Sequence, residues 1–200
     1  YGLPAVMYGQ VIFYNQRWAQ ELGFNQPPST TQEFQQQACA AATANNNGTG
    51  GWFANASAPA MLGWLYAFGA GVENPNGGYF FNSPSVADTF EFLAGLYTEE
   101  CAWLPTEQYP NPEFAQRQGL FYTSSITGIP YQWEAMTEAD NNDQWLAIPF
   151  PGPDGQSMVS LYGPSFVIFE ATPEENTAAW LLLKYLQEPN NQLPWVRANS

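Results

Sequence analysis

Residues 1–34 read YGLPAVMYGQVIFYNQRWAQELGFNQPPSTTQEF, and they predict a strand followed by two helices. The β-branched and aromatic run at 11–14 is typical of a strand. Asn15 suits the N-cap of a short helix over 16–22, because its side-chain oxygen can accept a free backbone N–H. Gly23 suits the left-handed position after the last turn, and Phe24 can then pack back on Ala19.

The second helix is predicted over 31–43. Thr30 and Glu33 have the spacing of a capping box, in which each side chain accepts a hydrogen bond from the other residue's backbone N–H. Apolar residues then recur at helical spacing at Phe34, Ala38 and Ala41.

The rest of the chain alternates short predicted strands with helices, which indicates an α/β fold. Further helices are predicted at 58–68, 85–98, 112–118, 130–139 and 173–188, and further strands at 120–122, 145–148 and 165–169.

Two of these helices carry a predicted core face. In the helix 85–98 this face consists of Val86, Phe90, Leu93 and Tyr97. The last helix starts with Thr172 as N-cap and proline at the first helical position, followed by two glutamates that favour the helix dipole. Its predicted core stripe is Leu181, Leu182, Tyr185 and Leu186.

The composition limits the classes of ligand. The chain has 18 acidic and 4 basic residues, a net charge of −14. Such a charge argues against nucleic acid and anionic membrane surfaces as partners. Few cations are available to pair with a phosphate or sulfate. A neutral or cationic small molecule fits better, although an acidic surface also serves solubility alone. With 45% hydrophobic residues, the chain can bury a sizeable core.

The order of several motifs resembles the bacterial extracellular solute-binding proteins of sugar ABC transporters, the family of maltose-binding and glycerol-3-phosphate-binding proteins. The motifs are the strand–helix unit before PPSTTQEF at 27–34, Gly51-Trp52, the helix 85–98, the strand with Ser124-Ser125, WLAIP at 145–149, Gly163-Pro164-Ser165 and TPEE at 172–175. The resemblance implies a periplasmic-binding-protein-like (type II) fold of two α/β lobes. By it, 1–9 would be the interlobe crossover, 10–158 most of the second lobe and 159–200 a return segment of the first lobe. The chain would then be a central fragment.

The resemblance also implies a function. The protein would bind a neutral sugar or oligosaccharide in an interlobe cleft and deliver it to the permease of an ABC importer, as a monomer and without a cofactor. It would work outside the cytoplasm, in the periplasm or at the cell surface, with or without a lipid anchor. In such a compartment the two cysteines, Cys39 and Cys101, favour a disulfide. Two separate buried thiols are the alternative.

Candidate ligand contacts follow from the family's site. Trp52 is predicted as a platform for a sugar ring, because an indole face covers the C–H face of a sugar; the alternative is burial under the preceding loop. Ser124 and Ser125 offer hydroxyls that can donate and accept, although they also fit an ordinary turn. Gly163 resembles a glycine that lets the ligand approach closely, and Ser165 can add a hydroxyl; simple strand initiation is the alternative for both.

Four further residues are weaker candidates. Met7 and Tyr8 lie on the predicted crossover, where they can line the cleft floor or form a hinge core. Tyr131 and Trp133 follow the Ser-Ser loop and can flank the site, but core packing is favoured for both. Trp64 lies in an apolar helix and is predicted to be in the core.

The sequence offers no catalytic constellation. It contains no histidine, which removes the commonest general base and the Ser-His-Asp triad, and two cysteines without histidine do not suggest a zinc site. No phosphate-binding loop, nucleophile elbow or calcium-loop spacing is present. An enzyme and a metal site are therefore not predicted. The alternative function is a secreted glycoside hydrolase or a carbohydrate-binding accessory domain, and a hydrolase would need two convergent carboxylates.

Overall fold

The computed structural model describes residues 2–198, and the side chains of residues 2–194. The chain forms two compact units. The larger unit is Tyr8–Tyr162, and the smaller one joins the N-terminal residues up to Met7 to the C-terminal part that starts at Gly163. The assignment of these units to two lobes stays a prediction, and Tyr1, the start of the predicted crossover, lies outside the described residues.

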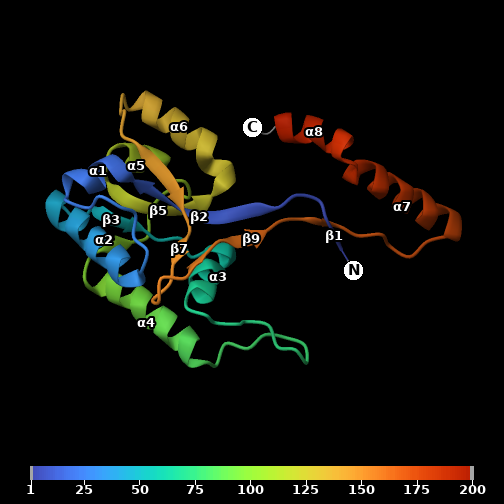
Figure 1. The fold of residues 1–200 in the computed structure, drawn as a ribbon, viewed down its shortest axis with the longest axis horizontal. Coiled ribbons are helices and arrows are strands. Elements are labelled where there is room, and N and C mark those ends of the chain that lie inside the picture. Colours follow the sequence, from blue (N-terminus) through green and yellow to red (C-terminus); the bar gives the residue numbers. More distant parts are fainter. Residues whose placement is uncertain (1, 199–200) are drawn as a thin grey trace. The chain divides into compact units, whose positions relative to one another are not determined.

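A six-stranded mixed sheet forms the centre of the larger unit (Figure 1). Its strands follow the order β4-β3-β5-β2-β6, and β9 pairs with the first residues of β2. β3 is parallel to β4 and β5, whereas β2 is antiparallel to β5, β6 and β9. The bounds are β2 (Tyr8–Asn15), β3 (Gly50–Phe53), β4 (Ala102–Trp103), β5 (Gly119–Ser125), β6 (Trp145–Ile148) and β9 (Ser160–Tyr162).

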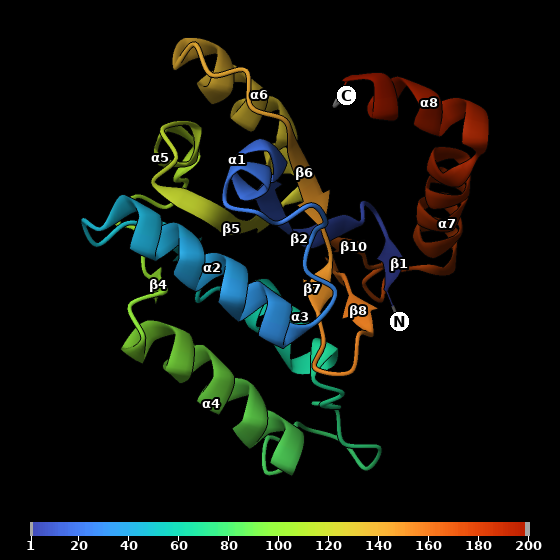
Figure 2. The same cartoon turned by 60° about the vertical axis from the view of Figure 1, so that its left-hand side comes forward.

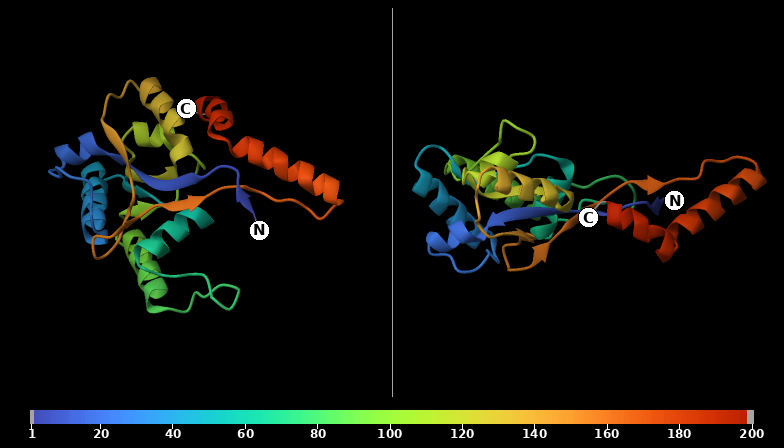
Figure 3. Two further views of the ribbon diagram at one scale, coloured as in Figure 1. Left: turned by 45° about the vertical axis from the view of Figure 1, so that its right-hand side comes forward. Right: turned by 90° about the horizontal axis from the view of Figure 1, so that it is seen from above.

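Helices cover both faces of this sheet (Figures 2 and 3). On one face Ile12 and Tyr14 pack against residues of α2, α3 and α4, and on the other face Val11 and Phe13 pack against residues of α5 and α6. The alternation of side chains along β2 therefore supplies both cores. The bounds are α1 (Gln16–Glu21), α2 (Thr31–Asn45), α3 (Ala58–Ala67), α4 (Pro84–Thr98), α5 (Asn111–Ala115), α6 (Ile129–Glu138) and the 3-10 turn η1 (Ile126–Gly128). The short strands β7 (Phe150–Pro151) and β8 (Ser157–Met158) pair with each other.

The predicted strand–helix unit at the start of the chain is confirmed. Asn15 Oδ1 accepts a hydrogen bond from the Trp18 backbone N–H at 2.9 Å, which caps α1. Gly23 has φ +97°, in the left-handed region that glycine adopts without strain. The Phe24 backbone N–H donates to the Ala19 carbonyl at 2.9 Å, and its ring packs on the core cluster that includes Ala19.

The cap of α2 differs in one detail from the predicted box. Thr30 Oγ1 accepts from the Glu33 N–H at 3.1 Å, as expected. The Glu33 carboxylate, however, accepts from the Ser29 N–H at 2.7 Å and from the Ser29 hydroxyl at 2.8 Å. The hydrogen bonds from the Ser29 backbone and hydroxyl lower the pKa of Glu33.

The predicted core face of α4 is confirmed in part. Val86 is buried and Leu93 packs against the core, but Phe90 is 51% exposed and Tyr97 also faces solvent. The buried face also includes Thr89 and Leu96, with Phe92 partly buried against the core. Because α4 carries aromatic residues around much of its circumference, apolar spacing alone fits more than one face.

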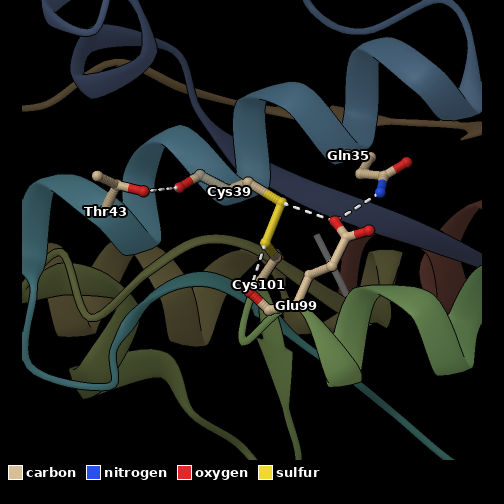
Figure 4. Close-up of a disulfide and its surroundings, with 5 residues drawn as sticks. All are labelled: Gln35, Cys39, Thr43, Glu99 and Cys101. Carbon is tan, nitrogen blue, oxygen red and sulfur yellow. Dashed lines mark hydrogen bonds between the residues drawn. A yellow bond between two sulfur atoms is a disulfide. The ribbon is translucent and has the colours of Figure 1, made fainter.

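A disulfide joins α2 to the turn after α4, as predicted (Figure 4). Cys39 and Cys101 have Cα atoms 4.6 Å apart. A Glu99 carboxylate oxygen lies 3.7 Å from Cys39 Sγ and accepts from Gln35 Nε2 at 2.7 Å. Although Glu99 and the two sulfurs cluster together, the sulfurs are bonded to each other and are not thiolate ligands for a metal.

In its described residues, the smaller unit contains one strand pair and two helices. β1 (Leu3–Pro4) pairs antiparallel with β10 (Ser165–Phe166), and α7 (Pro173–Gln187) precedes α8 (Pro189–Ala198). The Thr172–Glu175 capping box at the start of α7 is complete. The predicted core stripe of α7 is not covered, because Leu181, Leu182 and Tyr185 are exposed. Within the described part of the chain, no helix has the length and apolar content of a membrane span.

Candidate functional site

A groove of about 880 Å³ opens at one edge of the sheet in the larger unit. β3, β4 and β5 run in the same direction, so their carboxyl ends meet at this edge, where α/β proteins usually place ligands. β2 runs the opposite way, so its first residues reach the same edge. The walls come from residues 53–57, 104–111 and 122–125, together with Gln10, Tyr131 and Tyr162.

The lining combines aromatic rings with neutral polar groups. Tyr109, Tyr131 and Tyr162 supply rings with hydroxyl ends, and amides and hydroxyls come from both walls. Glu107 is the one charged residue among the lining residues, and none of them is lysine or arginine. Such a surface can stack on sugar rings and exchange hydrogen bonds with hydroxyls, but it offers no counter-ion for an anion.

Ser124 and Ser125 both line the groove. They form the end of β5 rather than a loop beyond it. Ser125 Oγ accepts from the Thr127 hydroxyl at 2.9 Å and from the Thr127 N–H at 3.3 Å, so it also caps η1. The two readings of this serine, ligand loop and local turn, are therefore compatible.

The two candidates on α6, Tyr131 and Trp133, differ in their position relative to the groove. Tyr131 is 64% exposed and lines the groove. Trp133 is 58% exposed, lies outside the lining and has its ring centroid 5.2 Å from that of Trp145. The expectation of core packing is wrong for both, because residues two apart on a helix point in different directions and neither direction here enters the core. Trp64 is fully buried, as predicted.

The expectation that Trp52 presents a free indole face is corrected. The residue is 3% exposed and packs edge-on against Phe34 and Trp64. Its Nε1 donates to Thr123 Oγ1 at 3.0 Å. Trp52 lies on β3, where neighbouring side chains alternate between faces, and the next residue, Phe53, lines the groove instead.

The remaining candidates lie away from the groove lining. Tyr8 is next to it, with its ring centroid 5.6 Å from that of the lining residue Tyr162. Met7, Gly163 and Ser165 belong to the smaller unit. There a Cβ on Gly163 would collide with the Val6 carbonyl oxygen, so chain packing alone accounts for this glycine. As ligand contacts, these residues stay predictions.

Several lining residues were missed by sequence reasoning. Asn55 and Tyr109 lie outside every helix and strand predicted from the sequence. Gln10 is the one with a usable signal, because it is a polar residue placed directly before the apolar run of β2.

One lining residue of the groove, the buried Tyr122, connects the sheet to its helices. The Tyr122 hydroxyl lies 3.0 Å from Asn111 Oδ1 and 2.8 Å from Gln132 Oε1, acceptors on α5 and α6. Burial raises the pKa of Tyr122 far above its ordinary value, so the hydroxyl stays protonated and can keep donating. The groove itself holds a single carboxylate, Glu107, and thus lacks the carboxylate pair of a glycoside hydrolase.

Comparison with protein families gives one match over the whole chain. The family model of the bacterial extracellular solute-binding proteins matches residues 1–200. The chain belongs to this family. Its members are non-catalytic binding components, so the hydrolase alternative is set aside. Comparison with the curated proteins gave no match.

Solved structures share the fold of this solute-binding protein. The sugar-binding protein MalE of Xanthomonas citri has a TM-score of 0.79 and 21% identity, covering 96% of this chain and 49% of its own. A cyclic α-maltosyl-1,6-maltose binding protein of Arthrobacter globiformis has a TM-score of 0.74 and 20% identity, with 96% and 49% covered. A Thermotoga lettingae solute-binding protein bound with α-D-tagatose has a TM-score of 0.73 and 21% identity, with 100% and 53% covered. The chain thus spans about half the length of these structures.

Proposed function

We propose that this chain is part of the substrate-binding component of an ABC importer and that the component binds a neutral sugar or oligosaccharide. The groove of the larger unit carries the proposal, because its lining joins four tyrosines to neutral amides and hydroxyls without any cation. The sugars named for the similar structures are consistent with it.

The mechanism we propose is capture and delivery. The larger unit forms most of the second lobe, and its groove is one wall of an interlobe cleft. Closure of the lobes about a hinge would surround the sugar, and the closed monomer would pass it to a membrane permease outside the cytoplasm. The acidic composition suits a neutral cargo.

The test is isothermal titration calorimetry of the intact protein with maltose, maltotriose, tagatose and ribitol, and with glycerol 3-phosphate as an anionic probe. We expect saturable binding of at least one neutral sugar, no binding of glycerol 3-phosphate and no reaction product by chromatography. Product formation, or preference for the anionic probe, would contradict the proposal.

A matched pair of variants on α6 tests whether the sugar binds in the groove. Tyr131→Ala removes a ring from the groove, whereas Trp133→Ala removes an equally exposed ring outside it. We expect Tyr131→Ala to weaken the best sugar by about tenfold, since an aromatic contact contributes up to about 1.5 kcal/mol. Trp133→Ala should leave the affinity unchanged, and equal effects of the two variants would move the site elsewhere.

A further inference from the structure

Three lining residues of the groove are both polar and deeply buried: Gln10, Tyr122 and Thr123. Buried polar groups in native proteins almost always have hydrogen-bond partners. Two of the three follow this rule. Tyr122 bonds to Asn111 and Gln132, and Thr123 accepts from Trp52.

Gln10 is different. It is 3% exposed, yet its side-chain amide makes no hydrogen bond to any other residue in the described part of the chain. Its register on β2, opposite Ser125 of β5 and Ser160 of β9, places it at the groove edge of the sheet. Gln10 lines the groove, and its amide atoms are not among the fully buried polar atoms that lack a partner, so the amide keeps some contact with solvent.

The other polar groups around Gln10 are largely committed to holding the walls. Asn55 Nδ2 donates to the Thr123 carbonyl at 3.2 Å, and its Oδ1 accepts from the Ser57 N–H at 2.9 Å. Ser125 caps η1. An amide offers two donors and an acceptor, so Gln10 brings unused hydrogen-bonding capacity to the groove from a buried position.

We infer that Gln10 determines sugar specificity by hydrogen bonding to a hydroxyl of the bound sugar. This inference rests on the proposed function and assigns one residue to it. A neutral amide recognises a hydroxyl, which donates and accepts, without requiring charge on the sugar. A sugar that lacks this hydroxyl would leave the amide buried and unpaired, and would therefore be rejected.

The test uses Gln10→Met in the intact protein, because methionine keeps the length and apolar stem of the side chain but removes the amide. Without sugar, the melting temperature should stay equal or rise, since no partner loses a hydrogen bond. Affinity for the best of maltose, maltotriose, tagatose and ribitol should fall about tenfold. Monodeoxy analogues of that sugar identify the hydroxyl. The wild type should bind one analogue more weakly than the parent sugar. Gln10→Met should bind that analogue and the parent sugar with equal affinity.

Gln37→Met is the matched control. Gln37 is equally buried but lies outside the groove lining, and its Nε2 donates to the Gln26 carbonyl at 3.1 Å. This variant should leave the affinity unchanged. The affinity is the control readout, because Gln37→Met removes both the Nε2 hydrogen bond and a buried Oε1 that has no partner.

Two results would overturn the inference alone: a lower melting temperature of Gln10→Met with intact affinity, or a loss of affinity with discrimination retained. A wild type that binds no sugar of the panel would overturn the proposed function and the inference with it.

Discussion

The two compact units differ in how much of their large apolar side chains they bury. In the larger unit Phe34, Trp64 and Phe150 are fully buried, and Trp64 contacts both other rings. In the smaller unit α7 buries Leu183, while Trp180, Leu181, Leu182 and Tyr185 are exposed. Both units have well-capped helices, so local helix signals do not distinguish them. The difference teaches that the stability of this 200-residue chain comes from the larger unit.

The strongest test of this difference compares Trp64→Ala with Leu181→Ala in the 200-residue chain. Trp64 contacts the rings of Phe34, Trp52, Phe92 and Phe150, so its removal leaves a cavity that these rings cannot fill. We expect Trp64→Ala to lower the free energy of unfolding by about 3–5 kcal/mol. Leu181 is 57% exposed, and Leu181→Ala should change the free energy of unfolding by less than about 0.5 kcal/mol.

Urea unfolding followed by circular dichroism measures both variants. If Leu181→Ala lowered the free energy of unfolding nearly as much as Trp64→Ala, the proposed difference between the units would be contradicted, because α7 would then contribute a core of its own.

Local signals in the sequence predicted much of the fold and little of the packing. Asn15, Gly23 and Thr172 act on neighbouring residues, so their roles can be read from spacing alone. The faces of α4 and α7 depend on what lies opposite, and this information is distant in the sequence. The predicted face of α4 was therefore right at Val86 and Leu93 but wrong at Phe90 and Tyr97, and most of the predicted stripe of α7 is exposed in this chain, although both helices were predicted correctly.

In the candidate site, too, local patterns predicted some residues, whereas the positions of others depend on packing between distant parts of the chain. The Ser124-Ser125 segment was predicted from the family's site, and it lines the groove because it ends a strand at that edge of the sheet. Trp52 was misplaced by one residue, since the side of a strand that faces the groove depends on register. Gln10 was not considered, because its importance comes from the absence of a hydrogen-bond partner, which only the three-dimensional arrangement reveals.

The disulfide provides a second test within the larger unit. The bond closes a chain separation of 62 residues between Cys39 and Cys101. In the chain-entropy description, such a loop restricts the unfolded state, and replacing both cysteines by serine should cost about 2–4 kcal/mol. Denaturation of the 200-residue chain with and without dithiothreitol measures the loss. The reductant should destabilise the wild type and leave the double serine variant unaffected. An equal effect of dithiothreitol on both proteins would show that the bond contributes no stability.

The smallest effect is expected at an ion-pair network on the surface of the larger unit. Arg117 contacts Asp143 through Nε at 2.7 Å and Nη2 at 2.8 Å, and reaches Glu21 through Nη1 at 2.6 Å. Burial raises the pKa of Asp143, but hydrogen bonds from Arg117 and Asn15 outweigh it, so the pKa is lowered. A lowered pKa in the folded state stabilises the protein above the unfolded pKa of about 4, and this stability disappears as the pH falls through the folded value.

We therefore expect Asp143→Asn to lower the free energy of unfolding by about 2 kcal/mol at pH 7, since it weakens hydrogen bonds to a charged group. Below the lowered pKa, wild type and variant should converge. Glu175→Gln is the counterpart in the smaller unit, where hydrogen bonds from the Thr172 backbone and hydroxyl lower the pKa of an exposed carboxyl. If the larger unit carries the stability, Glu175→Gln leaves the urea midpoint unchanged at every pH. A pH-dependent midpoint shift in Glu175→Gln equal to that in Asp143→Asn would instead make the two units a single cooperative structure.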